Sequence, residues 1–151
     1  MSKSKLTTFA VAIIIALLGY NQLDTTTPGQ YFTAPEAAPV GSAEELLDAF
    51  NRQTSNLQIS GEGRVVRVLA DDNNGSRHQR FLLETSFNQT ILVAHNIDLA
   101  PRIANLRNGD TVAFYGEYEY NNKGGVIHWT HHDPANRHPH GWLKHKGRTY
   151  Q

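Results

Sequence analysis

Histidines dominate the chemistry that this sequence could perform. All eight lie between His78 and His145, and six of them fall between His128 and Arg148, beside both tryptophans and one acidic residue. Imidazole and carboxylate groups bind zinc and similar divalent metals. The candidate metal ligands are the members of this segment that a bend could bring together: His128, His131, His132, Asp133 and His138.

Spacing along the chain does not by itself assemble such a site. If one strand ran over residues 126–132, His128 and His132 would share a face but lie about 13 Å apart. A turn at Asp133 could instead gather His132, Asp133 and His138. Solvated or packing histidines are the simpler alternative, because the sequence contains no H-E-x-x-H motif. The cofactor is unknown from the sequence, and a divalent metal such as zinc is the candidate.

Two further groups could bind a ligand or transfer a proton. Strand alternation places His78 and Arg80 on one face, where a cation beside an imidazole suits phosphate or carboxylate. His95 is a candidate for acid–base chemistry with Asp98, whereas Asn96 or Asp98 could simply cap the next turn. The catalytic candidates are His78, His95 and Asp98. The candidates for ligand binding are His78, Arg80, His95, Asn96, Lys123 and Trp129.

Composition excludes several classes of function. The 151 residues include 14 basic and 14 acidic side chains, so the formal net charge is zero and no globally basic surface is available for nucleic acid. There is no cysteine, which rules out disulfides, thiolate zinc sites, iron–sulfur clusters and cysteine nucleophiles. Any chemistry must use the remaining polar side chains.

The N-terminus predicts export. Lys3 and Lys5 precede an apolar stretch over residues 9–18, the arrangement of a secretory signal. No clean cleavage site follows, so residues 1–22 form either a signal peptide or an uncleaved anchor in the inner membrane. Residues 23–41, rich in Thr, Pro, Ala and Gly, predict a flexible spacer. We therefore expect a periplasmic domain over residues 42–151, either soluble or tethered to the inner membrane.

The rest of the chain predicts a small β-barrel. A capping box at Ser42 and Glu45 opens a helix that runs to about Gln53. Apolar runs and turn signals then predict five strands and one short helix or turn. The strands cover residues 57–70, 78–84, 90–95, 111–120 and 126–132, and the short helix or turn covers residues 98–106.

This order of elements predicts an all-β, OB-like barrel with an N-terminal helix and a histidine-rich C-terminal extension. A different antiparallel sheet with the helix on one face is the alternative. In OB barrels, ligands use the outer faces of strands two and three and the neighbouring loops. Here the loops are residues 71–77 and 121–125.

Three motifs carry a resemblance to a known family. They are HQRF at residues 78–81, AHNIDLAPR at residues 94–102 and GGVIHWTHHDP at residues 124–134. Together they resemble a bacterial family of exported proteins known only as a domain of unknown function. The family typically has Trp where this chain has Tyr120. The resemblance implies a small exported β domain and brings no established activity or catalytic residue.

The sequence leaves two functions open and does not decide whether the protein is an enzyme. The first is a binding module for an anionic polymer, nucleic acid or glycan, whose grip strengthens as histidines gain protons. The second is a metal-dependent hydrolase, acting on a phosphodiester, with His78 or His95 in proton transfer. Partners are unknown beyond these candidates and the inner membrane, if the N-terminal segment is uncleaved.

Overall fold

The computed structural model describes residues 41–151, and these begin with one helix. The predicted signal segment and, except for Gly41, the predicted spacer lie outside the described residues. Helix α2 (Gly41–Asn51) packs against the first strand and buries Leu46 and Ala49. Its Phe50 ring also contacts the ring of Tyr120, which follows the fourth strand. Within residues 41–151, no helix is long and apolar enough to cross a membrane.

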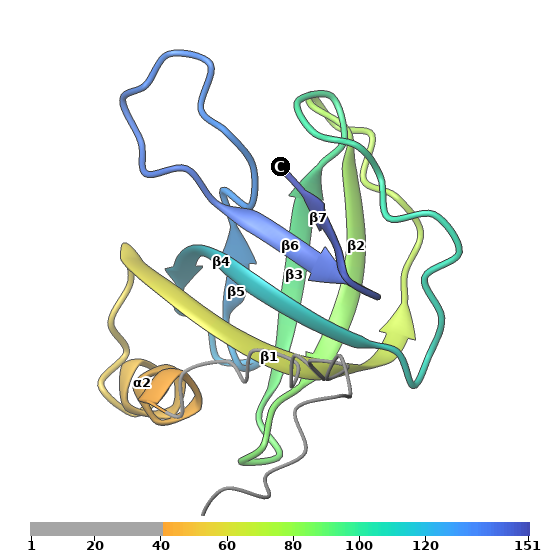
Figure 1. Ribbon diagram of the computed structural model, residues 1–151. Helices are drawn as coiled ribbons and strands as arrows, with labels where there is room; N and C mark the ends of the chain where they lie inside the picture. Colours follow the sequence, from red (N-terminus) through yellow and green to blue (C-terminus); the bar gives the residue numbers. More distant parts are fainter. Residues whose placement is uncertain (1–40) are drawn as a thin grey trace, which may run out of the picture. The chain divides into compact units, whose positions relative to one another are not determined.

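Five strands close into a barrel (Figure 1). They are β1 (Leu57–Val68), β2 (His78–Glu84), β3 (Thr90–Asn96), β4 (Thr111–Glu119) and β5 (Val126–His128). They pair in the order β1-β2-β3-β5-β4, and β4 returns to β1. The β3–β5 pair is parallel and the other pairs are antiparallel. The prediction of an all-β, five-stranded barrel with an N-terminal helix is confirmed.

Strand β1 closes the barrel because it pairs along both edges. Its first eight residues face β4, and its last part faces β2. Gly61 lets the ring of Phe114 approach, since a Cβ at Gly61 would lie 2.6 Å from that ring. The irregularity in the β1–β2 ladder falls between Val65 and Arg67, just after Gly61 and Gly63 in the sequence.

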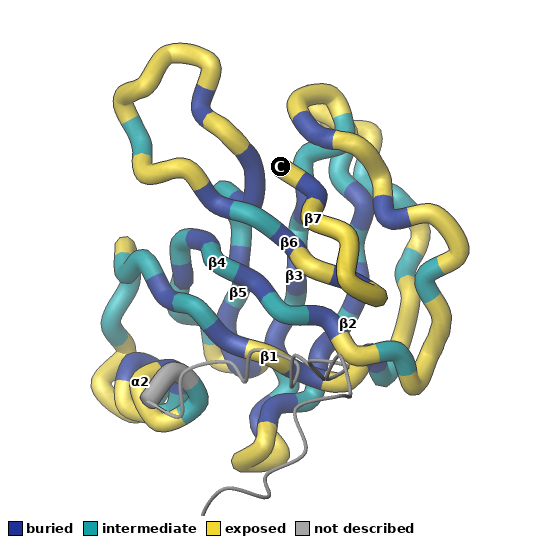
Figure 2. The backbone as a smooth tube through the Cα atoms, viewed as in Figure 1, coloured by how far each residue is buried: buried dark blue, intermediate teal, exposed yellow. Residues whose placement is uncertain are grey.

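Alternation along the strands separates the interior from the outer face. Strands β2, β3 and β4 alternate buried and half-buried side chains residue by residue (Figure 2). Phe81, Val93, Phe114, Tyr118 and Ile127 lie in the core and are fully buried. The side chains between them in sequence therefore point outward, where they are available for binding.

Two features of the local structure differ from the prediction, and one open alternative is decided. Strand β5 ends at His128 rather than His132, because Trp129 adopts a positive φ of 52° that no strand accommodates. Residues 98–106, which were predicted as a short helix or turn, form turns, so the second alternative is confirmed. Two further strands, β6 (Trp142–His145) and β7 (Arg148–Tyr150), were not predicted. Strand β6 pairs with β4 and buries Leu143, so it extends the sheet.

A long loop joins β5 to β6 (Figure 1), and it carries four of the eight histidines. We call residues 129–141 the histidine loop. Its base is closed by a hydrogen bond from the backbone N–H of Gly141 to the carbonyl of His131. Its first buried residues, Thr130 and His131, anchor it against the barrel, while residues 134–137 are exposed.

Candidate metal centre

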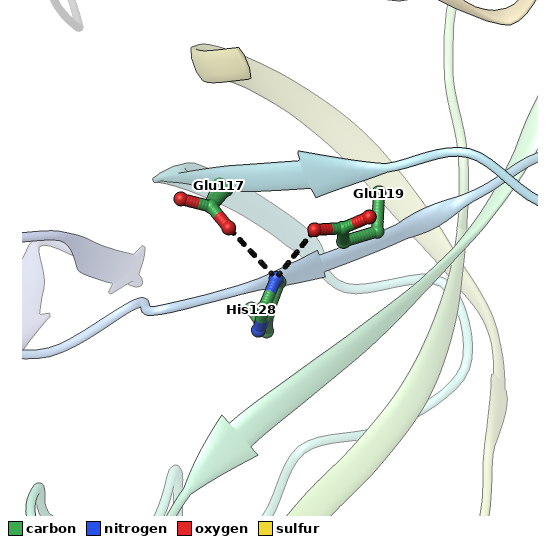
Figure 3. A group of neighbouring side chains, drawn as sticks. All are labelled: Glu117, Glu119 and His128. Atoms are coloured by element: carbon green, nitrogen blue, oxygen red, sulfur yellow. Dashed lines mark ion pairs between the residues drawn. The ribbon is translucent and has the colours of Figure 1, made fainter. Parts of the chain in front are cut away.

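Two neighbouring strands place one histidine and two glutamates together on the outer face of the barrel. Glu117 on β4 lies directly opposite His128 on β5, and Glu119 lies opposite Val126, two residues away. The side chains of Glu117, Glu119 and His128 all point outward. Glu117 and Glu119 are two residues apart on β4 and therefore share a face of that strand. One ligand atom from each lies within 4.8 Å of the others (Figure 3).

The distances between these atoms suit a shared metal ion. The Nε2 atom of His128 lies 3.4 Å from Oε1 of Glu117 and 3.9 Å from Oε1 of Glu119. Two ligand atoms bound tetrahedrally to zinc at their usual bond lengths are about 3.4 Å apart. The Glu117 pair already has this separation, and the Glu119 pair, at 3.9 Å, is about 0.5 Å longer.

His128 is held in the form that binds metals. Its Nε2 atom is buried and has no hydrogen-bond partner among the described residues, although it faces both carboxylates. Burial lowers the pKa of His128, and this effect outweighs the two glutamates, which raise it. The imidazole is therefore neutral at neutral pH, and only a neutral imidazole offers a lone pair to a metal.

His138, from the histidine loop, supports the glutamate side of this cluster. Its Nε2 atom lies 2.5 Å from Oε2 of Glu117, the carboxylate oxygen that is not turned toward His128. Its ring stacks on Trp129 at 4.2 Å and 9°. Burial alone would lower the pKa of His138, but the hydrogen bond to Glu117 raises it. Such bonds orient ligating carboxylates in metal sites.

An open hollow of about 310 Å³ borders the cluster on the same outer face. One wall carries Glu119 and His128, and the other carries His78 and Arg80 from β2. The remaining lining residues are Asp72, Ala94 and Val126. The hollow therefore lies over β2, β3, β5 and the end of β4. It includes the strand faces on which the sequence predicted ligand binding.

The other metal candidates from the sequence do not join this cluster. His131 is buried, and its Nδ1 atom bonds the carbonyl of His132. His132 is exposed and meets the ring of His140, 4.7 Å away. Asp133 accepts hydrogen bonds from the backbone N–H groups of residues 135, 137 and 138. Of the five candidates, the structure brings together His128 and, through Glu117, His138.

Replacing Asp133 by Ala is expected to loosen the histidine loop. Three backbone N–H groups lose their shared acceptor, and because the loop is largely exposed, water replaces part of the loss. We expect unfolding to become easier by about 1–2 kcal/mol and the amides of residues 135–138 to exchange faster with solvent. Hydrogen exchange measures this, with Asn122→Ala in another exposed turn as the control. Unchanged protection in the Asp133 variant would contradict the assigned role.

The remaining predicted residues lie at separate places. His95 is inside the barrel, fully buried between Thr130 and the carbonyl of Pro101. Asp98 is exposed and pairs with Arg77, whose backbone N–H bond is the main cause that lowers the pKa of Asp98. The Asn96 side chain accepts the N–H of Asp98, a turn-capping bond that the sequence suggested.

Two further predicted ligand-binding residues, Lys123 and Trp129, do not line the hollow. Lys123 lies exposed in the β4–β5 turn, whose backbone bonds the Asn121 side chain. Trp129 is half-buried and packs between the rings of His131 and His138. The lining residues among the sequence candidates are therefore His78, Arg80 and His128.

The sequence reasoning missed Glu117 and Glu119. A usable signal was present, because the predicted strands over residues 111–120 and 126–132 are joined by the short predicted loop of residues 121–125. Pairing these two strands places the two glutamates, spaced by two, opposite the strand that carries His128. The two glutamates meet His128 only across the paired strands, so spacing along a single strand does not reveal them.

Comparison with known proteins gives a family and no activity. Among curated proteins, none matches this chain. A family model described as "Protein of unknown function (DUF3465)" matches residues 32–151, which include every described residue and most of the chain. The predicted resemblance to a domain of unknown function is confirmed at that level: the chain belongs to the DUF3465 family.

Proposed function

We propose that this protein is an exported β-barrel module that binds a divalent metal ion such as zinc through Glu117, Glu119 and His128. One observation carries the proposal. The buried Nε2 atom of His128 has no hydrogen-bond partner in the described chain, yet it faces two carboxylate oxygens at metal-ligand spacing. A buried nitrogen without a partner costs free energy, and a metal ion would satisfy it and both carboxylates.

Export is part of the proposal and rests on the sequence. Lys3 and Lys5 followed by the apolar residues 9–18 support passage across an inner membrane. A metal site built from imidazole and carboxylate suits that location, because it needs no reduced thiol.

Binding of an anionic polymer is less well supported by the charges on this face. Arg77 pairs with Asp98, Arg102 pairs with Asp71, and Arg80 lies 4.0 Å from Asp72. These acidic partners, together with the two glutamates of the cluster, would meet an approaching polyanion and offset the arginines.

The metal-dependent hydrolase remains the second candidate, now with a different ligand set. Three protein ligands leave a coordination position open, as in catalytic zinc sites. A metal ion there would supply an activated water. The open hollow beside the cluster is the observation that favours it, because a substrate would have access.

Removing one carboxylate tests the metal site. The full chain, purified without a polyhistidine tag, is expected to bind one zinc ion by isothermal titration calorimetry. Glu119→Gln keeps the shape of the side chain but removes its charge, and we expect the affinity to fall by about a hundredfold or more. Loss of an indirect partner alone costs 10–100-fold in such sites.

Two variants provide matched controls for that measurement. Glu62→Gln removes an exposed carboxylate on β1, and His132→Gln removes an exposed imidazole outside the cluster. Both are expected to bind zinc as the unaltered chain does. Equal affinity in the Glu119→Gln variant, or no binding by the unaltered chain, would refute the proposed site.

A further inference from the structure

The hollow beside the metal centre has two chemically different walls. Glu119 and His128 lie on one side, and His78 and Arg80 lie on the other. Its volume of about 310 Å³ is at the lower end of the range for small-molecule sites. A bound ligand would thus be small, and it would contact the metal centre and the β2 side chains at once.

The β2 wall presents donors that are held in place. The Nε atom of Arg80 donates to the carbonyl of Ala70, and Nη1 lies 4.0 Å from the carboxylate of Asp72. Within residues 41–151, the Nη2 atom has no hydrogen bond. The Nδ1 atom of His78 donates to the carbonyl of Ser76, which fixes the ring. Arg80 therefore lines the hollow with a fixed orientation, and its Nη2 atom is available to donate to a ligand.

The charged side chains around the hollow determine whether an anion can bind there. Around the cluster and hollow, at most two cations, the guanidinium of Arg80 and the His138 ring bonded to Glu117, stand against the three carboxylates of Asp72, Glu117 and Glu119. This excess of negative charge repels an anion while the metal is absent. A divalent ion cancels the excess and adds an open coordination position that attracts an anionic oxygen.

We propose that the hollow binds the phosphate group of a small molecule between the metal ion and Arg80, and only when the metal is bound. The inference rests on the proposed metal site and names the ligand class of that site. A phosphate group favours this arrangement over a carboxylate, because its oxygens point in several directions. One oxygen can reach the metal while others accept from the guanidinium on the opposite wall.

The test uses inorganic phosphate and the full chain loaded with manganese. Phosphate bound to paramagnetic manganese relaxes rapidly, so ³¹P relaxation reports its binding. We expect enhancement beyond that of free manganese, and no phosphate binding to the metal-free chain by calorimetry. Arg80→Gln is expected to weaken phosphate binding about tenfold or more. The same variant should retain its manganese affinity, because Arg80 is not a metal ligand.

Arg67→Gln, which removes an exposed arginine on β1, is the matched control and should leave phosphate binding unchanged. Manganese binding without phosphate binding would overturn this inference and leave the metal site standing. Failure to bind any divalent metal would overturn the metal site and this inference together. Phosphate binding that is equal without metal or in Arg80→Gln, or acetate binding as tight as phosphate, would overturn the inference.

Discussion

We expect His95 to lower the free energy of unfolding by about 3 kcal/mol as the pH falls from neutral to 4, because His95 is buried as a neutral imidazole. Burial lowers the pKa of His95 from its ordinary value of 6.5 to about 4. Its Nε2 atom donates to the carbonyl of Pro101, so its Nδ1 atom accepts from the hydroxyl of Thr130. Both ring nitrogens are thus satisfied in the neutral form.

The sign of this effect follows from proton binding. The unfolded chain takes up a proton at His95 near pH 6.5, whereas the folded chain takes it up only near pH 4. Acid therefore favours the unfolded state between these two values, and each pKa unit of difference is worth about 1.4 kcal/mol. At neutral pH both states carry the neutral ring, so the effect is absent there.

Chemical unfolding at several pH values, with variants, measures the contribution. His95→Gln is expected to lose stability at pH 7 and to show a flatter pH dependence than the unaltered chain. His132→Gln, which removes an exposed ring, should keep the original pH dependence. An NMR titration gives a second readout, since the ring of His95 should remain neutral above pH 5. Identical slopes in His95→Gln and the unaltered chain would contradict this role.

Replacing Gly116 by Ala is expected to destabilise the barrel by about 3 kcal/mol and to weaken metal binding as well. A Cβ at Gly116 would lie 2.4 Å from the carbonyl oxygen of His128 and 2.8 Å from Thr130. The nearest obstacle is backbone, so β5 would have to move away from β4. Forcing extra atoms into a packed site costs about 1–3 kcal/mol, and a backbone contact this short belongs at the upper end.

Gly116→Ala tests the positioning of the metal centre because His128 moves with β5. We expect a lower midpoint in denaturant unfolding and a zinc affinity reduced at least about tenfold. Gly75→Ala is the control, since nothing lies within 4 Å of its Cβ and only its φ of 72° is strained. That control should cost about 1 kcal/mol and leave zinc binding unchanged. A Gly116 variant with full stability and affinity would show that β5 is not held as described.

The strand bounds were predicted correctly where apolar and polar residues alternate over many positions. They were predicted wrongly where a backbone turn ends the strand. Strand β2 has the predicted bounds, because seven residues alternate strictly between the core and the outer face. Strand β5 is shorter than predicted because Trp129 turns into a left-handed conformation. Strands β6 and β7 have four and three residues, too few for a periodic signal. Strand β6 forms because β4 offers an edge for pairing, and β7 in turn pairs with β6.

The candidate site was predicted only in its chemistry. The absence of cysteine and the abundance of histidine indicated imidazole and carboxylate ligands, and His128 was among the candidates. The carboxylates that the structure places beside His128 are those of Glu117 and Glu119 rather than Asp133, whose oxygens accept backbone N–H bonds. The spacing of residues in the sequence does not show whether an Asp such as Asp133 binds the backbone of its own loop or a metal ion.

The sequence by itself determined the barrel strands, which face of each strand is buried, and the residue types that any metal must use. Only the tertiary structure decided which outward side chains meet. Residues on one strand face are about 7 Å apart, whereas residues opposite each other on paired strands are about 5 Å apart. Pairing of β4 with β5 therefore joins Glu117 to His128, while histidines that are close in sequence point to separate places.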